Sequence, residues 1–315
     1  MDSKAHAVHH SSPSVNSQPI DRIQNPRRTG GFVLIQAFSK INLLLDVLYK
    51  RSDGYHELKS VMQTLALHDT VTIKKADTFQ VTCTNPNLPT DDRNIVTRAA
   101  KYMIQEFHIN QPVHIHIEKR IPISAGLAGG SSNCAATLKG LNTLFNLNIP
   151  LHSASHPCLM KIGQRFGADV PFCLVGGTAL AEGIGEKIIP LTPHPHAWVV
   201  LACPDIPVST ADIFNRYKPT PCHQSKLPGM LDALAQKDVK KISANLSNDL
   251  TQVTANIHPV INILVKELRN EGATAAAMSG SGPSVFGIFT NKKTAEQAYI
   301  NIQKTAKRAF LTEIQ

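Results

Sequence analysis

A glycine- and serine-rich segment, Pro122–Ser132, constrains the fold of this chain more than any other feature. It follows Val113–Ile117, in which apolar residues alternate and share one face, as they do in a strand. It runs directly into an apolar pattern of helical spacing that reaches Leu147. A turn between a strand and a helix start leaves main-chain N–H groups unpaired and facing outward, where they can hold a phosphate. The segment therefore predicts a phosphate-binding turn at the start of a helix.

The loop does not match the common nucleotide-binding motifs. No Gly-Lys-Ser/Thr ends it, so it is not a Walker loop, and it lacks the spacing and the later acidic residue of a dinucleotide fingerprint. A flexible connector in which Ser131 or Ser132 only caps the helix remains an alternative. A second loop of small residues, Met278–Ser284, is expected between a helix and a strand. By itself it fits a tight turn equally well, but two such loops can enclose a nucleotide from both sides.

Two charged residues stand among apolar ones. Lys40 separates the strand-like segments Phe32–Phe38 and Ile41–Leu48, and a partly buried ammonium at this position needs an anionic partner. Asp169 precedes the apolar run Val170–Val175. From its spacing alone, a helix or turn cap is the more natural role for Asp169 than catalysis.

Composition excludes several classes of protein. A chain of 315 residues, 42% hydrophobic and 17% charged, is long and apolar enough to fold without disulfides. The net charge of +9 favours phosphorylated partners, but the basic residues are dispersed and only 5% of residues are aromatic, so we expect no nucleic-acid partner. The six cysteines include no Cys-x-x-Cys pair and are expected to be free thiols without a metal site. Every apolar run is shorter than the roughly 18 residues of a membrane span. We expect a soluble protein with no membrane partner.

The pattern along the chain predicts a tail followed by two domains. Residues 1–31 are rich in Ser, His, Pro, Asn and Gln and have no periodic apolar face, which predicts a disordered tail. Prolines at positions 190, 193 and 195 mark a boundary, which gives domains at 32–192 and 193–315. The mixture of strands and helices indicates the α+β class. Helices are predicted at 94–107, 129–147, 150–166, 226–245, 258–270 and 294–309, and strands at 32–38, 41–48, 61–67, 70–73, 78–82, 113–117, 198–203 and within 280–289.

Several segments together resemble the GHMP kinase superfamily, and the likeness runs from about Gly31 to the C-terminus. The glycine-rich loop is common to the superfamily. The combination of Asp53–His56 with Gly167–Pro171 is similar to the branch that acts on a cytidine-diphosphate-linked sugar alcohol. The resemblance implies a two-domain α+β fold, with an N-terminal ATP-binding domain, a C-terminal ferredoxin-like α/β domain and the active site between them. The segments that carry it are Ala37–Leu43, Arg51–Glu57, Pro122–Asn133, Gly167–Pro171, Glu182–Glu186 and Ser279–Gly282.

The resemblance also implies an activity. It is the ATP-dependent phosphorylation of the 2-hydroxyl of a cytidylated methylerythritol in the non-mevalonate isoprenoid pathway, by a bacterial cytoplasmic enzyme that is a monomer or homodimer. Plastid import through the tail is a minor alternative. Mg²⁺ would be held mainly by the phosphates of ATP, with no side-chain metal site.

The family's site residues match positions in this chain. Lys40 and Asp169 would be the catalytic pair, with Asp169 taking the proton of the attacking hydroxyl and Lys40 neutralising developing charge. Cytosine would stack between Tyr55 and Phe214 while His56 reads its edge. The other substrate-binding positions would be Asn42 and Thr210. ATP would be bound by Pro122, Ile123, Ser124, Ala125, Gly126, Leu127, Ala128, Gly129, Gly130, Ser131, Ser132 and Asn133, together with Asn94, Ile95 and Lys119.

Two rival functions stay open at the level of sequence. A superfamily kinase acting on mevalonate or homoserine would keep the glycine-rich loop and Asp169 but would not need Tyr55, His56 or Phe214. A basic RNA-binding module is the rival of a different class, because the superfamily's N-terminal domain resembles folds found in ribosomal proteins.

Overall fold

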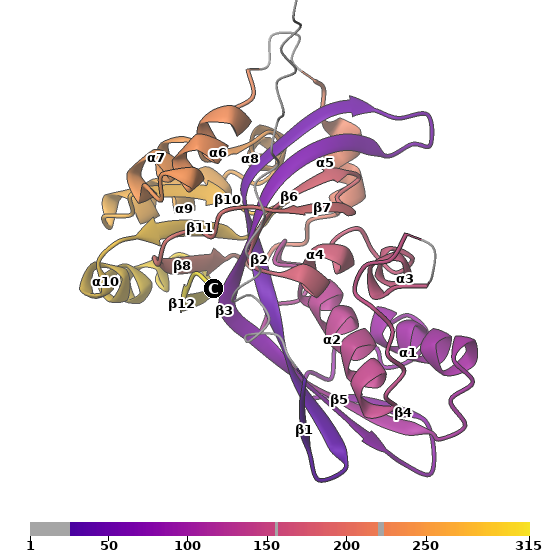
Figure 1. Cartoon of the computed structure of the whole chain (residues 1–315). Coiled ribbons are helices and arrows are strands. Elements are labelled where there is room, and N and C mark those ends of the chain that lie inside the picture. Colours follow the sequence, from indigo (N-terminus) through magenta and orange to yellow (C-terminus); the bar gives the residue numbers. More distant parts are fainter. Residues whose placement is uncertain (1–25, 155–156, 220–223) are drawn as a thin grey trace, which may run out of the picture.

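A long antiparallel hairpin runs through the molecule (Figure 1). The computed structural model describes residues 26–154, 157–219 and 224–315. In it, β2 (Phe32–Lys50) pairs with β3 (His56–Lys75) across a turn at residues 51–55. Each strand is continuous, so the prediction of separate shorter strands was wrong. The predicted interruption at Lys40 corresponds instead to a shift of register between Phe38 and Lys40.

The hairpin belongs to an eight-stranded sheet. Its main path has the order β1-β2-β3-β5-β4, with β6 on β3, β7 on β6 and β9 on β2. The helices α1 to α4 lie together on one side of this sheet (Figure 1). The remaining strands are β1 (Arg27–Thr29), β4 (Gln80–Cys83), β5 (Val113–Glu118), β6 (Thr178–Gly183), β7 (Lys187–Pro190) and β9 (Ser247–Asn248), and the helices are α1 (Ile95–Glu106), α2 (Gly129–Leu144), α3 (Leu159–Gln164) and α4 (Val170–Val175).

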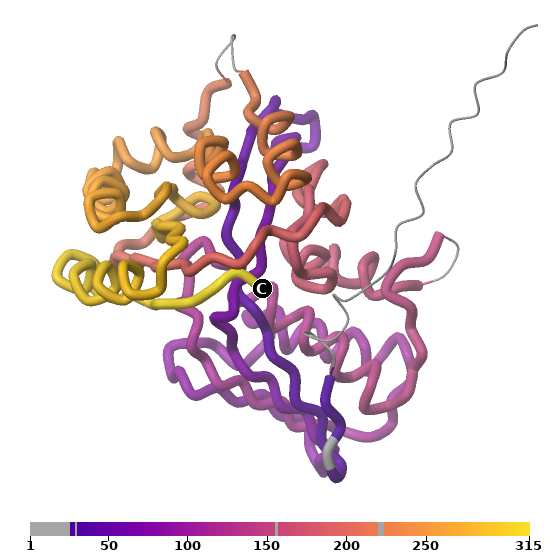
Figure 2. The backbone as a smooth tube through the Cα atoms, turned by 60° about the vertical axis from the view of Figure 1, so that its left-hand side comes forward, coloured from indigo at the N-terminus to yellow at the C-terminus, as the bar shows by residue number. Residues whose placement is uncertain are grey.

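A second, four-stranded antiparallel sheet forms the C-terminal half, with the order β10-β11-β8-β12. The chain end returns to the hairpin, where Ile314 bridges to Leu65 of β3 (Figure 2). The strands are β8 (Trp198–Cys203), β10 (Ala275–Met278), β11 (Val285–Phe289) and β12 (Arg308–Glu313), and the helices are α5 (Thr210–Arg216), α6 (Leu227–Ala235), α7 (Val239–Ala244), α8 (Thr251–Ile257), α9 (Val260–Asn270) and α10 (Lys292–Ile302).

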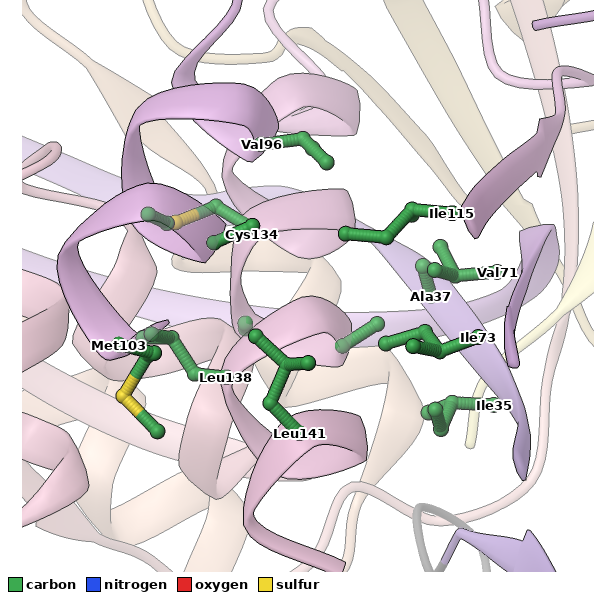
Figure 3. Packing of buried hydrophobic residues seen from close by; sticks show 14 of the residues in the cluster. Ile35, Ala37, Val71, Ile73, Val96, Met103, Ile115, Cys134, Leu138 and Leu141 are labelled. Carbon is green, nitrogen blue, oxygen red and sulfur yellow. The ribbon is translucent and has the colours of Figure 1, made fainter. Parts of the chain in front are cut away.

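The N-terminal core lies between the large sheet and the helices α1 and α2 (Figure 3). Ile35 and Ile73 reach from β2 and β3 toward α2, where Gly140 lets the helix come close. A Cβ atom at Gly140 would lie 2.6 Å from a methyl group of each isoleucine, so no larger residue fits without movement. This packing fixes the orientation of α2 and therefore the position of its N-terminus.

A second core cluster joins the two sheets. Ile41 and Leu44 of β2 belong to the same buried group as Leu201 of β8 and Phe286 of β11. A third cluster packs α8, α9 and α10 against the C-terminal sheet. The boundary predicted at 192/193 falls in the connection between β7 and β8, but the core is continuous across it.

The predicted tail ends too late. Residues 1–25 lie outside the described residues, as does Cys222. Arg27–Thr29 form β1, which pairs with β2 across a turn at Gly30–Gly31, where both glycines have positive φ. Those glycines allow the hairpin that brings these polar residues into the sheet.

Three of the predicted helices differ most from the structure. The segment 150–166 is helical only in α3, because Pro157 lacks an N–H for a helix and fits only at its first turn. The segment 226–245 divides into α6 and α7 at Lys237, whose φ of +53° lies in the left-handed region. The final helix stops at Ile302, and the residues from Arg308 pair with β8 instead. No helix in the described part of the chain is both long and apolar enough to cross a membrane.

Candidate active site

A cavity of about 500 Å³ opens between the glycine-rich loop, the hairpin and the C-terminal half. It gathers most of the predicted site residues. Leu127 and Ser132 are buried beside it, whereas Tyr55 and His56 are not part of its lining. The predicted residues that line it are Lys40, Asn42, Asn94, Ile95, Lys119, Pro122, Ile123, Ser124, Ala125, Gly126, Ala128, Gly129, Gly130, Ser131, Asn133, Asp169, Thr210 and Phe214.

The glycine-rich loop delivers the N-terminus of α2 to this cavity. Ala128 occupies the N-cap position with a φ of +56°, and no side chain caps the helix. Neither Ser131 nor Ser132 caps the helix, because both lie inside it, and the Ser132 hydroxyl donates to the carbonyl of Gly129 at 3.0 Å. The first N–H groups of a helix have no acceptor within the helix, so they remain available to an anion. The geometry favours a phosphate site over a capped connector.

The second small-residue loop lies against the first one. It connects β10 to β11, so the prediction of a helix before it was wrong. Ser279 donates a hydrogen bond from its hydroxyl to the Gly126 carbonyl at 3.0 Å. A Cβ atom at Gly126 would lie 2.5 Å from the Ser279 carbonyl oxygen, and Gly126 has a φ of +73°. Only glycine fits between the two main chains.

A buried carboxylate that the sequence did not reveal supports the start of the loop. Asp69 of β3 is fully buried and lies 2.6 Å from the Lys119 ammonium. Its other oxygen accepts hydrogen bonds from the main-chain N–H groups of Arg120 and Ile121, at 2.6 and 2.8 Å. Asp69 therefore positions Lys119 and the turn that leads into Pro122. Nothing local marks this aspartate, because its partners lie far along the chain.

Lys40 and Asp169 meet inside the cavity. The Lys40 ammonium lies 3.5 Å from an Asp169 carboxylate oxygen, and the two side chains are 5% and 31% exposed. Asp169 occupies the N-cap position of α4, but its side chain makes no capping hydrogen bond. The cap interpretation of Asp169 is therefore wrong. Its carboxylate faces the cavity beside the ammonium.

A short chain of hydrogen bonds holds the Lys40 side chain. Lys40 donates to the Asn42 side-chain oxygen at 2.8 Å, and the Asn42 amide group donates to the Ser60 hydroxyl at 2.7 Å. Ser60 in turn donates to the Leu44 carbonyl at 2.7 Å. All three polar side chains are buried, so each hydrogen bond offsets a desolvation cost. The arrangement fixes the ammonium beside Asp169.

The hairpin and α5 form the other end of the site. The rings of His56 and Phe214 have centroids 5.4 Å apart and are tilted by 37°. Thr210 and Ser281 are joined through their hydroxyl oxygens at 2.9 Å. Burial and the Lys50 ammonium lower the pKa of His56 below its ordinary value of 6.5. Tyr55 is 61% exposed and makes no described contact with Phe214, so its stacking role stays a prediction.

The cavity is also lined by residues that were not predicted as site residues, and only some of them belong to segments that the sequence singled out. Gly280 and Ser281 belong to the second loop, and Ile184 and Gly185 to the segment Glu182–Glu186, so their segments were visible in the sequence. Ala168 likewise belongs to the segment Gly167–Pro171, whereas Leu45, Leu58, Met62 and Leu88 are apolar residues that no sequence pattern distinguished from core residues. Among the described residues, no three His, Cys, Asp or Glu side chains are grouped so as to hold a metal ion.

Family models match both halves of the chain. The model described as GHMP kinases N terminal domain matches residues 94–177, and the model described as GHMP kinases C terminal matches residues 230–308. Together they cover the glycine-rich loop, Asp169 and the second small-residue loop. The predicted two-domain α+β fold is confirmed.

Curated relatives match over most of their length. A 4-diphosphocytidyl-2-C-methyl-D-erythritol kinase of Caldicellulosiruptor bescii is 46% identical over 285 residues, which is 88% of this chain and 96% of the relative. The kinase of the same name from Bacillus subtilis is 42% identical over 85% of this chain and 91% of its own.

Solved structures give the same picture of the fold. A crystal structure of 4-(cytidine 5'-diphospho)-2C-methyl-D-erythritol kinase superposes with a TM-score of 0.76 and 28% identity, covering 89% of this chain and 98% of that one. A homoserine kinase from Cytophaga hutchinsonii reaches a TM-score of 0.70 at 18% identity, over 92% of this chain and 96% of that one, a likeness of fold alone.

Proposed function

The chain belongs to the GHMP kinase family, and from this membership we propose how its cavity works. The protein is a small-molecule kinase. It transfers the γ-phosphate of ATP to the 2-hydroxyl of 4-(cytidine 5'-diphospho)-2-C-methyl-D-erythritol, in the non-mevalonate pathway to isoprenoid precursors.

One observation carries the assignment of the reacting groups. The Lys40 ammonium and the Asp169 carboxylate lie 3.5 Å apart in a cavity that is lined in part by the uncapped N-terminus of α2. A phosphate bound at that N-terminus and an alcohol bound beside Asp169 would occupy the same cavity. Phosphoryl transfer depends mainly on such positioning and on charge stabilisation.

In the proposed mechanism, Asp169 orients the attacking hydroxyl and takes its proton. The substrate oxygen forms the new bond to the γ-phosphorus, and the bond from that phosphorus to the oxygen bridging to the β-phosphate breaks, which releases ADP. Lys40 neutralises charge that develops on the transferring group. The N–H groups at the start of α2 and the Lys119 ammonium bind the remaining phosphate oxygens.

The substrate's cytidine end would lie near α5 and the hairpin. His56 is buried beside Phe214, so its neutral ring can accept a hydrogen bond from the exocyclic amine of the base while Phe214 contacts the face of the base. Tyr55 would supply the second ring, and Asn42 and Thr210 would contact the sugar alcohol and its linkage. All five assignments rest on the matching family positions, and those of Asn42, Thr210 and Phe214 rest also on the cavity lining.

The cavity also suits a magnesium ion bound with ATP. Asn133 is 1% exposed and lines the cavity, and its side-chain oxygen has no hydrogen-bond partner within the described residues. An amide oxygen is a hard donor of the kind that Mg²⁺ accepts. Asn133 would therefore contribute to holding the ion, whose main ligands would be phosphates. When bound, Mg²⁺ supplies charge neutralisation on the phosphates.

The test is a coupled assay of ADP release with three alcohols. We expect turnover with the cytidylated methylerythritol and none with mevalonate or homoserine. Turnover with only mevalonate or only homoserine would change the assigned substrate but would still show that the protein is a kinase. Nanomolar RNA binding at physiological salt without ADP release would contradict the assignment of the chain as a kinase.

A further inference from the structure

A second cavity, of about 610 Å³, lies in the C-terminal half and shares no lining residue with the first one. It is bordered by α7, by α9 and by β10, the edge strand of the four-stranded sheet. Nothing in the phosphorylation of the alcohol uses this cavity. Its lining therefore needs a separate explanation.

The lining is positively charged. Lys226, Lys240 and Arg269 border the cavity, and none of the described residues that line it is acidic. Lys226 donates to the Ala244 carbonyl at 3.2 Å and Arg269 to the Ala276 carbonyl at 3.3 Å. Each bond uses one donor of a side chain that has several, so donors remain for an anion. The carbonyls hold the two cations at the cavity wall without neutralising them.

A buried hydroxyl in the same lining has no partner. Ser243 is 5% exposed, and its Oγ makes no hydrogen bond within the described part of the chain. Leaving a buried hydroxyl without a hydrogen-bond partner costs free energy. A bound anion would accept a hydrogen bond from Ser243 and remove that cost.

One side chain lies between the two cavities. Asn248 lines the second cavity, and its amide group donates to the carbonyls of Met278 and Gly280, at 2.9 and 2.8 Å. Gly280 lines the catalytic cavity. A ligand in the second cavity would therefore sit against the residue that holds the second small-residue loop in place.

We propose that the second cavity binds a phosphate or diphosphate group of a small molecule. The hydroxyl of Ser243 and the cations Lys226, Lys240 and Arg269 contact its oxygens. The side chains of Leu246 and Val265, which also line the cavity, form an apolar wall for any organic portion. The proposal does not depend on which alcohol the kinase phosphorylates.

The test is calorimetric titration of inorganic diphosphate into the full chain. The catalytic cavity is first saturated with a non-hydrolysable ATP analogue and CDP, so that heat reports only on the second cavity. We expect one remaining site. Ser243→Ala should weaken binding about ten-fold, as should Lys240→Gln combined with Arg269→Gln, because each removes a charge-assisted hydrogen bond.

Lys241→Gln is the matched control. Lys241 lies on α7, as Lys240 and Ser243 do, but it donates to the side chain of Gln236 and does not line the cavity. Diphosphate binding should therefore be unchanged in this variant. Ser243→Ala breaks no described hydrogen bond, and equal thermal midpoints would show that it folds. Absence of binding once the catalytic cavity is filled, or equal affinity in the wild type and in both cavity variants, would overturn the proposal.

A parallel titration identifies the source of the anion. A short-chain alkyl diphosphate that binds more tightly than inorganic diphosphate would assign the cavity to an organic phosphate. Weaker binding of the alkyl compound would assign it to the inorganic anion. Both results support an anion site.

Discussion

Asp169 stands where a capping residue is expected, yet its side chain makes no bond to the helix that it precedes. The carboxylate is thus free to orient a substrate hydroxyl, and Lys40 is held beside it by Asn42 and Ser60. A structural cap would contribute to stability alone. A carboxylate of this kind should contribute mainly to turnover.

Asp169→Asn keeps the size of the side chain and removes its charge. We expect kcat to fall by about 10²-fold or more, because the amide cannot accept the hydroxyl proton, while ATP affinity changes little. Steady-state kinetics with both substrates varied would measure this. Asp212→Asn, an exposed carboxylate of α5 paired with Arg216, is the control and should keep normal kcat. Near-normal turnover in Asp169→Asn would remove this residue from the chemistry.

We expect His56 to make substrate binding depend on pH. Because burial and Lys50 lower the pKa of His56, its ring loses its proton at a pH below 6.5 and is neutral at neutral pH. We expect KM for the cytidylated substrate to stay constant above that value and to rise as the pH falls through the lowered pKa, because the protonated ring can no longer accept a hydrogen bond from the base. The profile of KM between about pH 5 and 8 tests this, with KM for ATP as the internal control. If KM for the cytidylated substrate rose in the same way at low pH in His56→Gln, a group other than His56 would cause the rise.

At the scale of elements, the glycine-rich loop depends on β3. Asp69→Asn would leave the Lys119 ammonium buried without a countercharge, and breaking one side of a buried ion pair costs about 3–5 kcal/mol. We expect a lower free energy of unfolding in denaturant titration and a raised KM for ATP.

The double variant Asp69→Asn with Lys119→Met separates stability from binding. It removes the unpaired charge, so part of the stability should return. KM for ATP should stay high, because Lys119 lines the cavity. Recovery of both quantities would show that Lys119 has only a structural role.

Elements with local signals could be predicted from the sequence. The helix α1 has an apolar stripe, and Asn94 caps it by accepting a hydrogen bond from the Val96 N–H at 2.9 Å. The strand β5 alternates buried and half-buried residues along its length. Elements that form only through pairing with distant segments of the chain could not be predicted in this way. The helix predicted at 294–309 overlaps the start of Arg308–Glu313, which pair with β8 because the packing of the sheet outweighs local preference.

The same distinction applies to the site. The glycine-rich loop and the unusual position of Lys40 were visible in local chemistry. The pairing of Lys40 with Asp169 came from resemblance, because no spacing rule joins a strand residue to a helix start so far along the chain. Asp69 was missed for this reason, since its role depends on the adjacent β5 and the turn after it.

The whole molecule should unfold as one unit, because Ile41 and Leu44 of the hairpin share a buried cluster with Leu201 and Phe286 of the C-terminal sheet. Phe286→Ala should lower the free energy of unfolding by about 3–5 kcal/mol, the usual cost of emptying a buried aromatic site. Fluorescence of Trp198, the single tryptophan, and far-UV circular dichroism should report coincident transitions. Two separate transitions would show that the halves unfold independently.

The contact between Gly126 and Ser279 limits how the enzyme can exchange its ligands. The two loops touch through main-chain atoms and a hydrogen bond beside the catalytic cavity, so a wide hinge opening there would have to break this contact. We therefore expect nucleotides to enter and leave without separation of these two loops. Small-angle scattering should accordingly give the same radius of gyration with and without ATP analogue and CDP, and a clear contraction on binding would contradict this.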